Sequence, residues 1–194
     1  FDAGFRYNNS VSFNGATDKS EYYVSFSQIS DDGMVPTDAD SYDKYTFSAR
    51  GSHKVKALTF SSSLNYSYQK NKFATTGQGL TMLNSLYQTP RDVSIISLQD
   101  QNDIFNSPGY FYTPYGVMNP YYILENYLNE YDAERFYGKF QVDYDFLKYF
   151  KFTYRMGLDT TTGQSNRGEP NLYALFYEGT PNGEGMGSNS PFYG

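Results

Sequence analysis

The sequence contains no cysteine and only one histidine. The absence of cysteine excludes disulfides, thiolate catalysis and cysteine-ligated zinc. The single histidine, His53, excludes a metal site built from several imidazoles. Its neighbour Ser52 would point to the opposite face of a strand, so these two residues are not expected to form a Ser–His dyad. We therefore expect no catalytic residue, no metal and no cofactor, and we do not expect an enzyme.

The chain also lacks a long apolar run and is short of basic residues. Its mean hydropathy of −0.66 argues against a transmembrane helix. The low hydropathy does not exclude a transmembrane β-barrel, because only alternate residues of a barrel strand contact lipid. With 15 Lys and Arg against 21 Asp and Glu, nucleic acid is not an expected partner. The sequence opens at Phe1-Asp2-Ala3 without a signal peptide, so we expect an interior piece of a longer protein.

Aromatic residues are plentiful, with 22 Tyr and 16 Phe, and many of them alternate with polar residues. Tyrosine is typical of membrane interfaces and of surfaces that bind sugars or peptides. The alternation is strictest in residues 136–146 and 150–159, which a turn at 147–149 joins into a hairpin. Each arm runs for about ten residues, against five or six in soluble strands and 9–11 in membrane-crossing ones. The hairpin therefore predicts two transmembrane β-strands.

The same pattern predicts further strands, which makes the fold class all-β: an antiparallel transmembrane β-barrel. The expected strands span residues 5–14, 21–30, 44–54, 58–69, 135–146 and 150–160. Short turns alternate with longer links, including a loop at about 70–132 and another from 162, as in barrels with tight periplasmic turns and long extracellular loops. Within that loop, Leu80, Leu83 and Leu86 predict a short helix stopped by Pro90, and Asn119-Pro120 predicts the start of another that includes Leu124 and Leu128.

Charged residues keep to one face of the predicted strands. The apolar register lacks Asp, Glu, Lys and Arg through its central span, where a Lys or Arg facing lipid would cost about 2–4 kcal/mol. The opposite register carries Arg50, Lys139, Asp143, Lys151 and Arg155. This division predicts one face toward lipid and one toward a wet or plugged lumen.

A succession of motifs in residues 5–159 resembles the SusC/RagA family of TonB-dependent outer-membrane transporters of Bacteroidetes. The run Ser12 to Phe26, SFNGATDKSEYYVSF, is similar to the family's SFSGGTDKTxYYxS strand-turn-strand. It is followed in order by DGMVP at 32–36, KYTFSAR at 44–50, LNYSY at 64–68 and MNPYY at 118–122. These resemble the family's EGIVP loop, its YxxRxN and LNYSY strands, and its NPY motif.

The resemblance implies about six strands of a 22-stranded plugged barrel in the outer membrane of a Gram-negative, Bacteroidetes-like cell. It also implies import of oligosaccharides or peptides beneath a SusD-like surface lipoprotein that serves as a lid. The plug domain and TonB box, through which the TonB complex would supply energy, are absent from these residues.

Tyrosines of the long loop are the candidate substrate-binding residues. Tyr110, Tyr112, Tyr115, Tyr121 and Tyr122 can stack on sugar rings or peptide side chains and donate hydrogen bonds. The alternative is that they pack the loop against itself or against the lid.

Two other patterns have plainer interpretations. Asp31, Asp32, Asp38 and Asp40 carry oxygen ligands suited to calcium but lack EF-hand spacing, and a solvated loop is the expected outcome. The GxGxG run at 183–187 follows no strand–helix unit and is expected to be a flexible loop.

Two functions stay open at this point. The first is an outer-membrane importer that binds and moves a nutrient without bond chemistry. The second is a soluble secreted β-sandwich adhesin or carbohydrate-binding module, which would bury the same apolar faces between two sheets. Dependence on detergent distinguishes them, because a sandwich should be soluble and monomeric without it.

Overall fold

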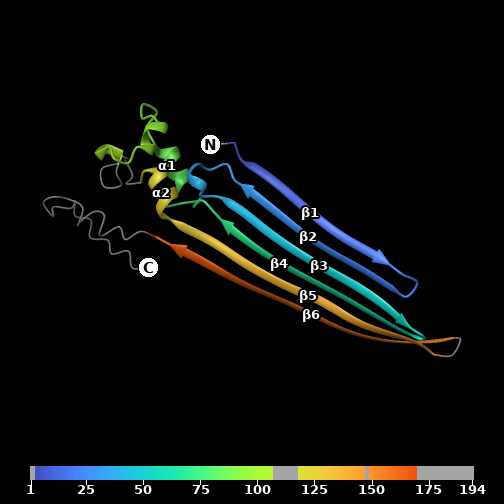
Figure 1. Ribbon diagram of the computed structural model, residues 1–194. Helices are drawn as coiled ribbons and strands as arrows, with labels where there is room; N and C mark the ends of the chain where they lie inside the picture. The colour runs from blue at the N-terminus through green and yellow to red at the C-terminus, as the bar shows by residue number, and fades with distance from the viewer. Residues whose placement is uncertain (1–2, 107–117, 147–148, 170–194) are drawn as a thin grey trace. The chain divides into compact units, whose positions relative to one another are not determined.

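A computed structural model describes residues 3–106, 118–146 and 149–169. The described chain is all-β in character, with six antiparallel strands and a few short helices. The strands are β1 (Phe5–Ala16), β2 (Ser20–Asp32), β3 (Ser41–Val55), β4 (Leu58–Lys72), β5 (Leu128–Phe146) and β6 (Phe150–Gly168). They lie side by side in chain order, so the sheet is a meander with β1 and β6 at its edges (Figure 1). Within the described residues the sheet does not close.

The helices are short. They are the α-helices α1 (Met82–Gln88) and α2 (Pro120–Asn126) and the 3₁₀ turns η1 (Pro36–Asp38), η2 (Ile96–Gln99) and η3 (Ile104–Asn106). None of the helices in the described segments is long and apolar enough to cross a membrane. The chain divides into a sheet unit, residues 1–73 and 130–166, and a loop unit, residues 74–129 and 167–194.

All six predicted strands are present, and each is longer than the sequence indicated. β1 and β2 have 12 and 13 residues, and β5 and β6 have 19 each. β5 begins at Leu128 and not near 135, so the predicted loop 70–132 is reduced to residues 73–127. The register explains the difference, because Lys72 still pairs with Glu130 and Asn71 with Tyr131 after the apolar alternation has ended. The strand pairing continues there although charged residues, such as Glu130, Asp132 and Glu134, now occupy the register that was apolar before.

The end of β6 shows the same effect. Residues after 162 were predicted as loop from their Gly, Ser and Asn content, yet the strand continues to Gly168. The suggested ordered piece near 172–176, the glycine run at 183–187 and turn residues 147–148 lie outside the described residues.

Both predicted helices are confirmed in outline. α2 begins as expected, with Pro120 at its first position and the Asn119 side chain accepting a hydrogen bond from the Tyr121 backbone N–H at 2.9 Å. α1 contains Leu83 and Leu86 and ends at Gln88, before Pro90, but Leu80 was wrongly included because the helix begins only at Met82. Leu128 was wrongly assigned to the apolar side of the second helix, because it is already the first residue of β5.

The two units differ in how they bury apolar side chains. Met118, Tyr122 and Ile123 form a small core in the loop unit, with Leu80 and Tyr127 packed against it. In the described part of the sheet unit, Ala133 is the only hydrophobic residue that is buried. Most apolar side chains of the six-stranded sheet are therefore not covered by other described residues.

Candidate functional site

The apolar face of the sheet is continuous across all six strands and exposed. Cross-strand partners bring apolar residues together in rows, such as Val11, Phe26, Phe47 and Tyr66. Its most exposed members include Phe5, Val11, Phe13, Tyr22, Val24, Phe26, Tyr45, Phe47, Phe60, Leu64, Tyr66, Phe140, Tyr144, Phe146, Phe150, Phe152, Tyr154, Met156 and Leu158, and each of these is between 36% and 67% exposed. A patch of this size on a protein surface marks an interaction with a membrane or another molecule.

Charged residues begin abruptly on this face at the end of the strands that leads to the longer loops. Tyr68 pairs with Glu134, and in the next row Asp43 pairs with Lys70 and Lys70 with Asp132. Toward the short turns the face ends in aromatic residues, where Phe146 contacts the rings of Tyr144 and Phe150 with centroids 5.7 Å apart in both cases. The apolar face is therefore a band with a defined upper and lower limit.

The opposite, polar face carries cross-strand networks of charged and amide groups. Arg135 on β5 makes a two-pronged ion pair with Asp159 on β6, through Nε at 3.1 Å and Nη2 at 2.7 Å. Its guanidinium also lies 5.0 Å from the ring centroid of Tyr137. The pair fixes β5 against β6 at mid-strand with a planar, directional contact.

Asp143 is the centre of a second network. Its carboxylate accepts hydrogen bonds from Thr153 Oγ1 at 2.7 Å and Gln141 Nε2 at 2.9 Å, and it lies 3.5 Å from Lys151 Nζ. Gln141 in turn accepts a hydrogen bond from Arg155 Nε at 3.0 Å. Asp143 is only 7% exposed, so its charge is held by partners and not by solvent.

The only histidine forms a contact that the sequence did not predict. His53 Nδ1 lies 2.6 Å from the hydroxyl of Ser20, its cross-strand partner on β2. Ser52, as expected, is on the other face, where it pairs with Glu21. In the described residues His53 has no carboxylate partner, and the Ser20 backbone N–H donates to Thr17 Oγ1 at 3.1 Å. The pair therefore ties the β1–β2 turn to β3, and only the strand register could have revealed it.

The acidic loop after β2 is organised by Asp40. Its two carboxylate oxygens accept hydrogen bonds from the backbone N–H groups of Met34 at 3.1 Å and Val35 at 2.9 Å. A Cβ on Gly33 would collide with this carboxylate, so glycine is needed for the close approach. In the segments that the structure describes, no three His, Cys, Asp or Glu residues are grouped to hold a metal ion. The Asp40 oxygens stabilise the backbone of the loop by accepting hydrogen bonds from Met34 and Val35.

Replacing Asp40 with alanine should loosen this loop, because two backbone donors lose a charged acceptor. We expect a local cost of about 1–2 kcal/mol, seen as faster amide hydrogen exchange at Met34 and Val35. Asp38→Asn is the matched control in the same loop and should leave these rates unchanged. Protection of the wild-type loop by added calcium would contradict this account.

Two of the five tyrosines predicted to bind substrate lie in the described residues. Tyr122 is 8% exposed and packs in the loop-unit core, whereas Tyr121 next to it is half-buried. Tyr110, Tyr112 and Tyr115 lie outside the described residues. Substrate binding by the five tyrosines therefore stays a prediction.

Asn119 connects the helix that follows it to the 96–106 loop. It is fully buried, and its Nδ2 donates to the carbonyl oxygens of Leu98 at 2.8 Å and Asn106 at 2.7 Å. The sequence predicted its capping role but not these two long-range bonds. They hold the segment that carries η2 and η3.

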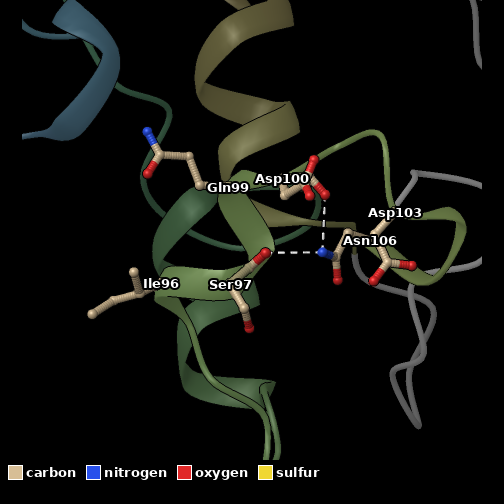
Figure 2. A pocket seen from close by; sticks show the side chains of 6 residues that line it. All are labelled: Ile96, Ser97, Gln99, Asp100, Asp103 and Asn106. Atoms are coloured by element: carbon tan, nitrogen blue, oxygen red, sulfur yellow. Dashed lines mark hydrogen bonds between the residues drawn. The ribbon is translucent and has the colours of Figure 1, made fainter.

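That segment carries an open hollow of about 480 Å³ (Figure 2). Its lining consists of Ile96, Ser97, Gln99, Asp100, Asp103 and Asn106. Asn106 Nδ2 donates to the carbonyl oxygens of Ser97 and Asp100, both at 2.9 Å, so these two backbone acceptors already have a partner within the loop. With two carboxylates and no Lys or Arg, the hollow can accept hydroxyl or ammonium donors.

Burial at the end of α2 makes the loop unit sensitive to alkali. Burial is the main cause that raises the pKa of the Tyr127 phenol above 10.0, and the charges of Glu169 and Tyr122 add to it. Because the folded unit favours the neutral phenol, this contribution is complete below about pH 10 and is lost as the pH rises through the raised pKa. Tyr127→Phe should flatten the loss of loop-unit stability as the pH rises above about 10, followed by circular dichroism. The exposed Tyr87→Phe is the control, and equal slopes for both variants would refute the assignment.

Comparison of the sequence with protein-family models gives no match. Comparison with curated proteins gives none either.

Proposed function

We propose that this chain forms part of the barrel wall of an outer-membrane importer of the SusC/RagA, TonB-dependent type, which takes up oligosaccharides or peptides. The observation that carries the proposal is the exposed apolar face on strands of 12 to 19 residues. The motif resemblance in residues 5–159 points in the same direction.

The height of the apolar band supports a membrane as its partner. On β4 the band runs from Leu58 to Tyr68, ten residue steps, before Lys70 begins the charged row. At about 3.4 Å per residue the band is about 34 Å long, and a strand tilt of about 45° reduces this to a height of about 24 Å. The lipid-facing band of outer-membrane barrels is about 25 Å tall.

The edges of the sheet support further strands on both sides. β1 and β6 each have one paired and one unpaired edge in the described chain, and β6 continues for 19 residues. Long unpaired edges are templates for association, and inside a bilayer their backbone groups would lack hydrogen-bond partners. A barrel closed by strands from elsewhere in a longer protein satisfies both.

In this proposal the polar face lines the lumen of the barrel and the loops lie at its extracellular end. The charged networks around Arg135 and Asp143 line the lumen, where a plug domain would lie. The loop unit, between β4 and β5, lies on the extracellular side and offers its surface to substrate and to a SusD-like lipoprotein lid. The import step itself needs no bond chemistry from these residues, because energy would come from the TonB complex.

Fractionation of cells that make the full-length protein tests the proposal. We expect the protein in the outer-membrane fraction, extractable only with detergent, and faster migration in dodecyl sulfate gels before heating than after. Loss of the gene should abolish uptake of one class of oligosaccharide or peptide. A monomeric protein in the culture supernatant, soluble without detergent, would favour the secreted β-sandwich instead.

A further inference from the structure

The polar face of the sheet is basic, although the chain as a whole carries a net charge of −6. Strand register and cross-strand contacts place its charged side chains. The basic ones are Arg6, Lys44, Arg50, Lys54, Arg135, Lys139, Lys151 and Arg155, and the acidic ones are Glu21, Asp31, Asp143, Asp145 and Asp159. Basic groups therefore outnumber acidic groups on the face that would line the lumen.

Three of the acids on this face are already neutralised. Asp159 is paired with Arg135, Asp143 with Lys151 and Asp31 with Arg6. By contrast, some cations have only uncharged partners. Arg50 lies over the ring of Tyr23 at 5.3 Å, and Arg155 donates to the amide of Gln141.

Lys139 belongs to this uncompensated set, since it has no carboxylate partner within the described residues. The middle of the polar face therefore keeps free positive charge.

A hollow of about 450 Å³ lies on this face beside Lys139. Its lining consists of Ser63, Asn65, Tyr137, Gly138, Lys139, Gly157, Leu158 and Asp159. Gly157 leaves the room, because a Cβ there would meet nothing nearer than the Gly138 carbonyl oxygen at 3.6 Å. Close backbone packing therefore does not require glycine at position 157, and a larger side chain would fit there without strain.

The lining favours a sugar with an acidic group. Lys139 supplies a charge for a carboxylate or sulfate, the Tyr137 ring supplies an apolar surface, and Ser63 and Asn65 supply hydrogen bonds for hydroxyl groups. The charge of Asp159 does not repel such a ligand strongly, because Arg135 holds it in a two-pronged pair. Leu158 is the one aliphatic residue in the lining, and its side chain belongs to the opposite, apolar face of β6. The polar face therefore offers no aliphatic side chain in this hollow to receive the apolar side chains of a peptide.

We propose that this hollow binds the anionic group of an acidic oligosaccharide, a uronate or a sulfated sugar, on its way through the barrel. The proposal rests on the proposed function, which makes the polar face the wall of the transport path. It narrows the substrate from oligosaccharides or peptides in general to negatively charged saccharides.

Binding to outer-membrane vesicles that contain the full-length protein tests it. The probes are trigalacturonate, a sulfated chondroitin disaccharide and neutral maltotriose, each titrated at low and high salt. We expect one or both acidic probes to bind at least tenfold more tightly than maltotriose, and high salt to reduce this preference. The two acidic probes distinguish carboxylate from sulfate.

Variants locate the effect in the hollow. Lys139→Gln should weaken binding of the acidic probe about tenfold, and Gly157→Val should weaken it by filling the space. Lys54→Gln and Ser12→Val are the controls, on the same face but outside the hollow, and should bind as the wild type does. Each variant is first checked for the heat-dependent gel shift, so that failure to form a barrel is seen separately.

Three results would overturn the inference while leaving the importer intact. The first is equal binding of acidic and neutral saccharides by a correctly inserted protein. The second is preference for an acidic peptide over both acidic sugars. The third is a Lys139→Gln variant that loses stability but no affinity, which would mean that the basic face only pairs with an acidic segment of the protein.

Discussion

Replacing Leu64 with arginine is expected to destabilise the sheet in a bilayer by about 2–4 kcal/mol. Leu64 is on the apolar face of β4, with Ala49 as its partner on β3 and Gly138 as its partner on β5, and it is 38% exposed. In lipid the guanidinium would have neither water nor a carboxylate near it. The effect is measured as the loss of folded, faster-migrating protein on refolding of the full-length chain into vesicles.

Ser67→Arg is the matched control. Ser67 lies three residues along the same strand and therefore on the polar face, where its partners are Thr46 and Arg135. An arginine there should cost less than about 1 kcal/mol, because it meets a wet lumen. Similar refolding of the two variants would mean that lipid does not contact the apolar face.

The second large effect is expected at Asn119. Replacing it with leucine keeps a similar volume but removes the partners of the Leu98 and Asn106 carbonyl oxygens and of the Tyr121 N–H. Because the site is fully buried, these groups would be left unsatisfied, at a cost of roughly 3 kcal/mol or more to the loop unit. Limited proteolysis between residues 74 and 129 should accelerate accordingly.

Asn126→Ala provides the comparison for this site. Its amide makes a single hydrogen bond, to the Tyr122 carbonyl oxygen at 2.9 Å, in a partly buried position. We expect a loss of about 1 kcal/mol, and no change in the heat-dependent gel shift for either variant. If Asn119→Leu were cleaved no faster than Asn126→Ala, the buried amide would not be what holds the 96–106 segment.

The strands could be predicted from sequence because each has two different faces. Phe140, Val142 and Tyr144 alternate with Lys139, Gln141 and Asp143, and this pattern alone identifies β5. Where the alternation ends, the signal ends too, although the strand does not. Residues 130–134 pair with β4 through backbone hydrogen bonds and the ion pair between Lys70 and Glu130, and neither interaction produces an apolar pattern in the sequence.

Side-chain contacts between strands could not be predicted from the sequence, for a related reason. The contact of Ser20 with His53 and the ion pair of Arg135 with Asp159 join residues 33 and 24 positions apart. Each follows from the register, which a single sequence does not specify. Asn119 was identified as a cap from its proline neighbour, but its burial depends on how η2 packs near α2.

Lipid contact with the apolar face is the claim on which the rest depends, and tryptophan fluorescence measures it directly. The sequence has no tryptophan, so Phe47→Trp and Ser67→Trp each place one reporter in these residues, on the apolar and polar faces respectively. Any tryptophan elsewhere in the full-length protein is first replaced by phenylalanine. In vesicles of brominated lipid, the account predicts strong quenching of Phe47→Trp and little quenching of Ser67→Trp. Equal, weak quenching at both positions would contradict it, because the apolar face would then be covered by protein.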